Sequence, residues 1–290
     1  MPNFSIEVSP ADDLIDVPRR IIVRGAHPGE PVRISSATLR NGAEWRSTAC
    51  YIADAYGHVD VSMNPAIDGD YYGIDPMGLL WSQKPVQAGR RDNFHADVMA
   101  PLVTTLTVSS LDQAGLAPCT PASTELVQRL AAAGVTRREV REEGLVGTLF
   151  LPATPGPHPA VMILNGSGGG INEPRAALFA SRGVAAFALA YFKAPGLSDY
   201  ISNTPLEYFE RGLDWLRAEV QPLHDFVAIS GQSRGGELVL LLGATFPQKV
   251  SAVLAYVPSA LVHSGQNAAD PAVGREGPTW LLRGQPLPHQ

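Results

Sequence analysis

The pentapeptide Gly231-Gln232-Ser233-Arg234-Gly235 has the residue types and spacing of a serine nucleophile held in a sharp turn. The run 226–230 before it is apolar and strand-like, and the run 237–246 after it has a helix-forming composition. G-x-S-x-G between a strand and a helix is typical of a nucleophile elbow, whose strained turn lifts the serine hydroxyl off the sheet. Gly231 and Gly235 are expected because a Cβ on either side would crowd this turn. The backbone N–H of Arg234 is then expected to stabilise an oxyanion at the start of the helix.

A second element supports this interpretation. The glycine-rich run 165–170 (NGSGGG) follows an apolar, strand-like segment at 160–165. A serine hydrolase of this architecture places its second oxyanion donor on a loop after an earlier strand, so we expect Gly166, Ser167 and Gly168 to complete the oxyanion hole. A glycine-rich loop can instead hold a phosphate, but neither G-x-x-x-x-G-K-[ST] nor G-x-G-x-x-G is present.

Composition narrows the functional classes. The net charge of −6, with a pI near 5.6, gives no electrostatic support for nucleic-acid binding. No stretch approaches the apolar length of a membrane span, and the N-terminal residues do not form a signal peptide, so no membrane role is expected. Cys50 and Cys119 lie far apart, which predicts neither a metal site nor a disulfide framework. We expect no cofactor and a cytoplasmic location.

Residues 1–112 are typical of a β-sandwich, because short segments with β-branched or alternating residues are separated by turn residues such as those at 27–30 (HPGE). The aromatic segment 69–85 interrupts this pattern. We expect it to be a packed loop whose Tyr71, Tyr72 and Trp81 plug the sandwich or meet the next domain. Residues 113–135 are interpreted as a linker, with a short helix over 124–135.

Residues 136–290 have a different sequence pattern. A hairpin over 136–152 comes first, and continuous apolar strands then alternate with helices. This alternation predicts a mostly parallel sheet covered on both faces. One of the helices, at 204–220, is amphipathic, with an apolar stripe formed by Leu206, Phe209, Leu213 and Leu216. The fold class is therefore α/β, an α/β-hydrolase domain preceded by a β-sandwich.

The whole chain resembles the family of acyl-CoA thioesterases and bile acid-CoA:amino acid N-acyltransferases. The resemblance is carried by the segments 69–85 (GDYYGIDPMGLLWSQKP), 134–152 (GVTRREVREEGLVGTLFLP), 205–210 (PLEYFE) and 231–237 (GQSRGGE). It implies a β-sandwich joined to an α/β-hydrolase domain, and a CoA thioester that is attacked by the elbow nucleophile to give an acyl-enzyme.

The type of nucleophile favours one reaction within this family. By resemblance, the amino-acid transferases carry Cys at the elbow and the thioesterases carry Ser. A Ser acyl-enzyme is an oxygen ester, which reacts less readily with amines than a Cys thioester and is turned over by activated water. Ser233 therefore favours hydrolysis of an acyl-CoA. Two alternatives stay open: an acyltransferase to an amine or alcohol, and a catalytically incomplete protein that binds acyl-CoA.

The acid and base of a triad are missing from the expected place. In this fold they follow the nucleophile on later loops, but only 57 residues follow Ser233 and a single clear strand, 251–257, lies among them. His263 is interpreted as a loop residue, and His289 with Asp270 or Glu276 has the right order but no supporting strands. We therefore expect the base to lie outside these residues, the domain to be truncated after strand 251–257, and the chain alone to hydrolyse acyl-CoA poorly.

The same interpretation has a consequence for the sheet. The strand 251–257 is apolar, uncharged and free of proline, and no later strand is predicted beside it. The unpaired backbone N–H and C=O groups of such an edge strand can bind a strand of another chain. We expect self-association at this edge, or a complementary second chain.

Overall fold

The structure is a computed structural model that describes residues 3–87, 97–111 and 119–290. The chain divides into two compact units, Met1–Leu130 and Ala131–Gln290. The border between the units therefore lies at residue 130, within the segment 113–135 that the sequence suggests as a linker.

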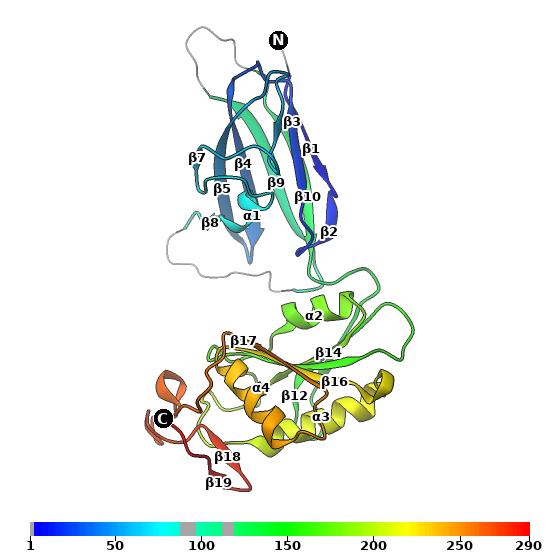
Figure 1. Cartoon of the computed structure of the whole chain (residues 1–290), viewed down its shortest axis with the longest axis vertical. Coiled ribbons are helices and arrows are strands. Elements are labelled where there is room, and N and C mark those ends of the chain that lie inside the picture. The colour runs from blue at the N-terminus through cyan, green and yellow to red at the C-terminus, as the bar shows by residue number, and fades with distance from the viewer. Residues whose placement is uncertain (1–2, 88–96, 112–118) are drawn as a thin grey trace. The chain divides into compact units, whose positions relative to one another are not determined.

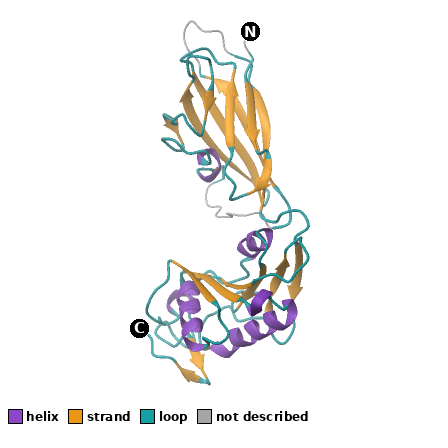
Figure 2. Ribbon diagram, turned by 45° about the vertical axis from the view of Figure 1, so that its right-hand side comes forward, coloured by secondary structure: helices purple, strands orange, loops and turns teal. Residues whose placement is uncertain are grey.

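The first unit is a β-sandwich (Figures 1 and 2). One sheet has the order β2 (Asp12–Leu14), β10 (Ala122–Arg129), β9 (Leu102–Ser110), β4 (Pro31–Arg40), β5 (Ala43–Ile52) and β7 (Asp68–Gly69), and β8 (Lys84–Pro85) also pairs with β5. The other sheet has the order β1 (Ser5–Ser9), β3 (Arg20–Arg24) and β6 (Val59–Asp60). Side chains of both sheets form one buried cluster, which includes Ile6, Val23, Ile34 and Leu126. The predicted sandwich is confirmed.

The helix predicted over 124–135 is wrong. Residues Ala122–Arg129 form β10, which pairs antiparallel with β9 along its length. Leu126 and Gln128 are buried while Glu125 and Val127 on either side are less so, which is the period of a strand. The free edge of β9 offers this segment a hydrogen-bonding partner, and that pairing outweighs the helix propensity of its residues.

The aromatic segment is only partly as predicted. It contains the short helix α1 (Gly78–Trp81), and Tyr71 is buried with its hydroxyl hydrogen-bonded to that of Tyr51. Tyr72 and Trp81, in contrast, are 71% and 62% exposed and do not fill the core of the sandwich. Trp81 lies outside the core of the sandwich. Its indole N–H donates to Asp75 Oδ2 at 2.8 Å, and this hydrogen bond holds the ring at the surface.

The second unit is built on one sheet with the order β11-β12-β14-β13-β16-β17. These strands are β11 (Thr136–Val140), β12 (Val146–Leu151), β14 (Ala185–Ala190), β13 (Ala160–Leu164), β16 (Val227–Gln232) and β17 (Ala252–Tyr256). The pairs from β14 to β17 are parallel, and β11 and β12 form the predicted antiparallel hairpin. This sheet is the predicted α/β-hydrolase sheet.

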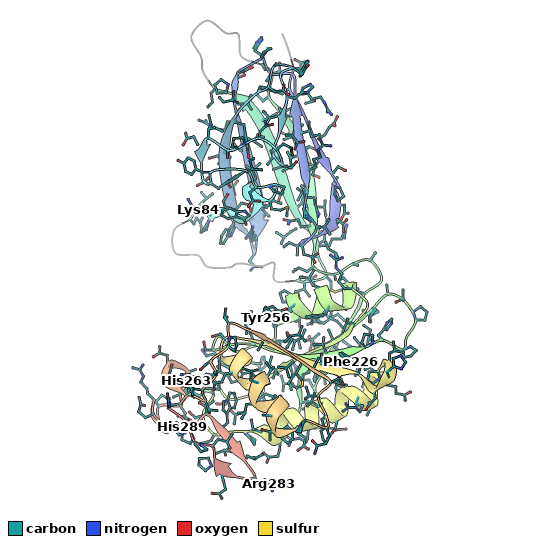
Figure 3. The ribbon with its side chains drawn as sticks, viewed as in Figure 1. Lys84, Phe226, Tyr256, His263, Arg283 and His289 are labelled. Atoms are coloured by element: carbon teal, nitrogen blue, oxygen red, sulfur yellow. The ribbon has the colours of Figure 1, made fainter. Side chains whose placement is uncertain are left out.

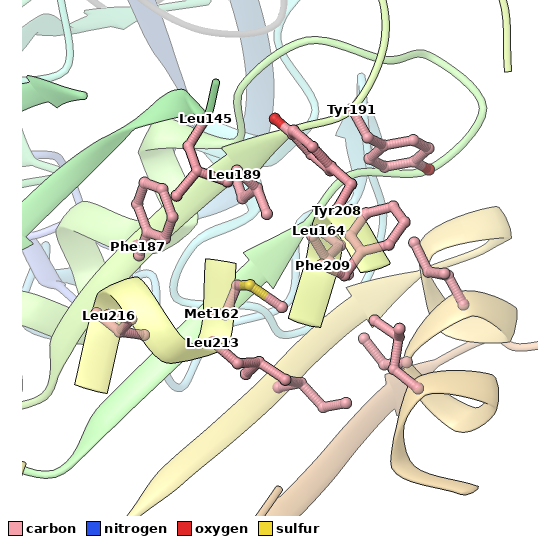
Figure 4. Packing of buried hydrophobic residues seen from close by; sticks show 14 of the residues in the cluster. Leu145, Met162, Leu164, Phe187, Leu189, Tyr191, Tyr208, Phe209, Leu213 and Leu216 are labelled. Carbon is pink, nitrogen blue, oxygen red and sulfur yellow. The ribbon is translucent and has the colours of Figure 1, made fainter. Parts of the chain in front are cut away.

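Helices cover both faces of this sheet. Figure 1 shows α2 (Glu173–Ser181) over one face, and α3 (Leu206–Val220) and α4 (Arg234–Thr245) over the other. All four predicted stripe residues of α3 are fully buried against the sheet, where each large apolar side chain contributes roughly 1.5–3 kcal/mol. Figure 4 shows three of them, Phe209, Leu213 and Leu216, packed among strand residues such as Met162 and Leu189.

The C-terminal residues form a small separate sheet. β15 (Thr204–Pro205) pairs in parallel with β18 (Trp280–Leu282), which forms a hairpin with β19 (Gln285–Pro286). Two short 3₁₀ turns, η1 (Leu223–Asp225) and η2 (Gln266–Ala268), complete the unit. This tail does not pair with β17, whose only hydrogen-bonded strand among the described residues is β16.

Candidate active site

Ser233 occupies the predicted elbow between β16 and α4. Its φ of 53° and ψ of −120° are strained for a residue with a side chain, and such strain is typical of functional turns. A Cβ on Gly231 would lie 2.1 Å from the carbonyl oxygen of Gly235, and a Cβ on Gly235 would lie 2.5 Å from that of Asn165. Both positions therefore require glycine. The Ser233 N–H donates to the Tyr256 carbonyl at 2.9 Å, which ties the turn to β17.

The glycine-rich loop 165–170 lies beside this serine. A Cβ built on Gly166 would come within 3.3 Å of the Ser233 Cβ, so the two turns are in close contact. The Gly166 N–H is already donated to Asn165 Oδ1 at 3.0 Å, whereas Ser167 and Gly168 are exposed and Ser167 lines the cleft next to Ser233. Of the three predicted residues on this loop, Ser167 is the one that lines the cleft.

The serine opens into a polar cleft of about 410 Å³. Its lining residues come from the elbow, from the loop after β17 and from the segment that contains η2: Ser167, Ser233, Arg234, Glu237, Val257, Pro258, Ser259, His263, Gly265, Gln266, Asn267 and Ala268. Among the residues that the structure describes, none donates to or accepts from the Ser233 hydroxyl. The cleft is the place where a substrate carbonyl can meet the nucleophile.

A buried carboxylate is among the residues that line this cleft. Glu237, in the first turn of α4, is only 4% exposed. Arg234 Nη1 donates to both of its carboxylate oxygens at 3.1 Å, and the Trp280 indole N–H donates to Oε1 at 3.2 Å. Arg234 also donates to the carbonyl oxygens of His263 and Ser264, so the charge pair fixes the segment 263–264 against α4. These bonds compensate the burial of the carboxylate.

Glu237 also orients a histidine. His263 Nδ1 lies 3.0 Å from Glu237 Oε2, and the His263 ring is about 30% exposed toward the cleft. If Nδ1 carries the proton and donates it to the carboxylate, Nε2 is the nitrogen left to accept a proton. A carboxylate and a histidine in this contact correspond to two of the three members of a catalytic triad, and no described contact joins them to Ser233.

The sequence alone does not predict this pair. His263 lies in a loop, as expected, but its contact with Glu237 is visible only in the fold. The sequence signal for Glu237 is a glutamate four positions after Ser233 that is followed by an apolar run. The pairing itself depends on the fold, because α4 and the segment after β17 meet only in three dimensions.

The C-terminal candidates are not among the residues that line the cleft. Figure 3 labels His289 and His263, which both lie in the C-terminal part of the second unit. The two ring nitrogens of His289 are each 3.0 Å from a carbonyl oxygen, those of Leu287 and Glu276, and these hydrogen bonds raise the pKa of the ring. Asp270 Oδ1 accepts the N–H of Ala272. Neither residue lines the cleft that contains Ser233. The structure therefore does not bring His289 and Asp270 together with the nucleophile.

No helix in the described part of the chain is both long and apolar enough to cross a membrane.

Comparisons with known proteins agree with this architecture. A family model for the acyl-CoA thioester hydrolase/BAAT N-terminal region matches residues 16–142, and a model for the BAAT/acyl-CoA thioester hydrolase C terminus matches residues 204–273. Acyl-coenzyme A thioesterase 1 of Rattus norvegicus is 37% identical over 247 residues, which cover 82% of this chain and 57% of that protein.

Two further relatives give a similar result. The mitochondrial acyl-coenzyme A thioesterase 2 of Mus musculus is 38% identical over 87% of this chain and 55% of its own length. Acyl-coenzyme A thioesterase 1 of Homo sapiens is 36% identical over 90% of this chain and 63% of its own length. The chain thus spans somewhat more than half the length of the curated relatives it matches.

Proposed function

Because this chain belongs to the acyl-CoA thioester hydrolase/BAAT family, we propose that it hydrolyses an acyl-CoA to the free acid and CoA, with Ser233 as the nucleophile. The observation that carries the proposal is the strained Ser233 elbow, which opens into a polar cleft beside a glycine-rich loop. The names of the relatives supply the substrate class.

In the proposed reaction, Ser233 Oγ attacks the thioester carbonyl carbon and loses its proton to a base. The negative charge that develops on the carbonyl oxygen is stabilised by the N–H of Arg234 and by the loop at Ser167. The carbon–sulfur bond then breaks, CoA leaves as a thiol with the proton from the base, and the acyl group remains as an ester of Ser233. A water molecule, deprotonated by the same base, releases the acid and restores the serine.

We propose His263 as the base in this chain, oriented by Glu237. The support is the 3.0 Å contact between His263 Nδ1 and the buried carboxylate, together with the position of both residues in the cleft of Ser233. The described contacts include no hydrogen bond between His263 and Ser233, and such bonds often form only when substrate is bound. The proposal replaces our expectation that the base lies outside these residues.

The test is product analysis with a panel of acyl-CoA substrates of different chain length. We expect free acid and CoA thiol from the wild-type chain, and a loss of at least ~10³-fold in rate for Ser233→Ala. Ser5→Ala, on β1 of the sandwich, is the matched control. Undiminished hydrolysis by Ser233→Ala would exclude the assignment. Formation of an acyl conjugate when amino acids are added would identify the chain as an acyltransferase.

We also propose a cytoplasmic location. Cys50 and Cys119 are both free thiols and both buried, which fits a reducing compartment. Since one relative is named as a mitochondrial protein, fractionation of cells that produce the protein is the test, and recovery in an organelle fraction would contradict the proposal.

A further inference from the structure

A cluster of metal-ligating groups lies in the sandwich, apart from the cleft. His27, Pro28, Gly29 and Glu30 form a tight turn in which the Glu30 N–H donates to the His27 carbonyl at 3.0 Å and Gly29 has a φ of 73°. Proline followed by a residue with positive φ is typical of a type II turn. The Glu30 side chain folds back, and its Oε2 accepts the His27 N–H at 2.7 Å. The turn therefore holds the His27 and Glu30 side chains on the same side.

Cys119 reaches this turn from a distant part of the sequence. Its Sγ lies 3.7 Å from Glu30 Oε2 and 3.5 Å from the carbonyl oxygen of Gly25. Ser110 links the same residues, because its hydroxyl donates to Glu30 Oε1 at 2.7 Å and accepts the Cys119 N–H at 3.0 Å. One nitrogen, one sulfur and one oxygen, from His27, Cys119 and Glu30, lie within 4.8 Å of one another.

Two features of this cluster are unexplained by the protein alone. His27 Nε2 is buried and has no hydrogen-bond partner in the described structure, although buried polar atoms are nearly always paired. Glu30 is only 3% exposed, and within residues 3–87, 97–111 and 119–290 no lysine or arginine forms an ion pair with it. The His27 N–H and the Ser110 hydroxyl donate to its carboxylate, so hydrogen bonds offset part of the cost of burial, but no cation balances its charge. A bound cation resolves both features, because it accepts the nitrogen lone pair and neutralises the carboxylate.

We propose that His27, Glu30 and Cys119 bind a divalent transition-metal ion, and that this ion is Zn²⁺. Zn²⁺ takes imidazole nitrogen, carboxylate oxygen and thiolate sulfur at about 2.0–2.3 Å, so tetrahedral donors lie roughly 3.3–3.8 Å apart. The observed 3.7 Å between Sγ and Oε2 fits this spacing. A water molecule would supply the fourth ligand, and Ser110, which donates to the other carboxylate oxygen, would orient Glu30.

Binding requires one proton to leave the site. On binding, the S–H bond breaks, the sulfur keeps the electron pair and bonds to Zn²⁺, and the proton passes to solvent. The ion then ties the turn 27–30 of one part of the sandwich to Cys119, which precedes β10 by three residues. Its role is structural, and it is independent of the proposed chemistry at Ser233.

The test uses the full chain, freed of metal with a chelator and then incubated with Zn²⁺ or Co²⁺. We expect about one zinc ion per chain after desalting, a near-ultraviolet thiolate-to-Co²⁺ absorption band, and a higher melting temperature with zinc than with chelator. Cys119→Ser is expected to lose the cobalt band and at least tenfold in zinc affinity. His27→Gln is a second variant at a partly exposed position, and it is expected to weaken binding while the circular dichroism spectrum is unchanged.

Cys50→Ser is the matched control, because Cys50 is an equally free and buried thiol that lies outside the cluster. It should bind zinc and show the cobalt band like the wild type. Absence of the band and of bound zinc in the wild type would overturn the proposal. So would equal zinc affinity in the wild type, Cys119→Ser and His27→Gln. Because each readout is binding or stability, failure here leaves the proposed hydrolase activity untouched.

Discussion

At the scale of single residues, the cleft combines a strained nucleophile with a rigid charged support. Glu237 has three partners, Arg234, His263 and Trp280, and removing one partner of such a buried group typically costs 3–5 kcal/mol. A Glu237 variant would therefore lower both the stability of the fold and the reaction rate, so the two effects could not be separated. His263 is a cleaner position to test, because its ring is partly exposed and its backbone contacts survive a side-chain change.

We predict that His263→Ala slows the reaction of Ser233 with a fluorophosphonate by roughly 10²-fold, the usual contribution of a general base. The reason is that the Oγ proton loses its acceptor. Labelling is followed by intact-mass spectrometry over time. His289→Ala, a change at a histidine outside the cleft, should label at the wild-type rate. Equal rates for His263→Ala and wild type would show that His263 is not the base.

At the scale of secondary-structure elements, strong local patterns were predictable and pairings between distant segments were not. The sequence predicts the hairpin of β11 and β12, the buried stripe of α3, and the strand–turn–helix around Ser233. Each of these has a periodicity or turn chemistry contained within one short window. β10 was missed because its strand conformation depends on the neighbouring edge of β9. The contact of His263 with Glu237 was missed for the same reason, since it joins residues 26 positions apart.

The elbow itself allows a stability prediction. Gly231→Ala should destabilise the second unit by about 3 kcal/mol, because the added methyl group would meet backbone atoms of Gly235 that cannot move aside. Gly168→Ala is the control, since nothing lies within 4 Å of a Cβ there, and a change within about 0.5 kcal/mol is expected. Urea unfolding measures both. A Gly231→Ala protein as stable as Gly168→Ala would show that the turn is looser than described.

The segment 69–85 is tied to the sandwich by Asp70, which predicts a pH dependence. Burial alone would raise the pKa of Asp70, but hydrogen bonds from Lys84 Nζ at 2.9 Å and the Thr48 N–H at 2.8 Å outweigh it, so the pKa is lowered. The unfolded chain then binds the proton more tightly than the folded one. The resulting stability is complete above the ordinary aspartate pKa of about 3.9 and is lost as the pH falls through the lower folded value.

We therefore predict that Asp70→Asn lowers the urea midpoint near neutral pH and reduces the further loss of stability between about pH 5 and pH 3. Asp68→Asn, on the neighbouring exposed strand residue, controls for removing a negative charge from this surface. If the acid-induced change in midpoint is the same for Asp70→Asn and wild type, Asp70 does not anchor the segment.

At the scale of the whole molecule, β17 leaves one edge of the second sheet without a partner among the described residues. Its residues Val253 and Tyr256 are 39% and 46% exposed, and the tail that could have covered them pairs with β15 instead. An uncharged, apolar edge of this kind favours pairing with another chain. We propose self-association at β17, or capture of a complementary chain.

This proposal predicts that sedimentation velocity detects dimers or larger species of the 30.9 kDa chain at micromolar concentration. Val253→Lys places a charge on the edge and should shift the protein toward monomer. A stable wild-type monomer, without any bound partner, would refute the proposed association at this edge.

In the proposed reaction, Ser233 carries the acyl group of an acyl-CoA as a covalent intermediate. The most direct measurement is rapid acid quenching of the chain mixed with acyl-CoA, followed by mass spectrometry of the peptide that contains residue 233. We expect a mass increase of one acyl group on Ser233, which decays to free acid and is absent from Ser233→Ala. Acyl-CoA hydrolysis at the same rate by wild type and Ser233→Ala, with no acylated peptide, would contradict it.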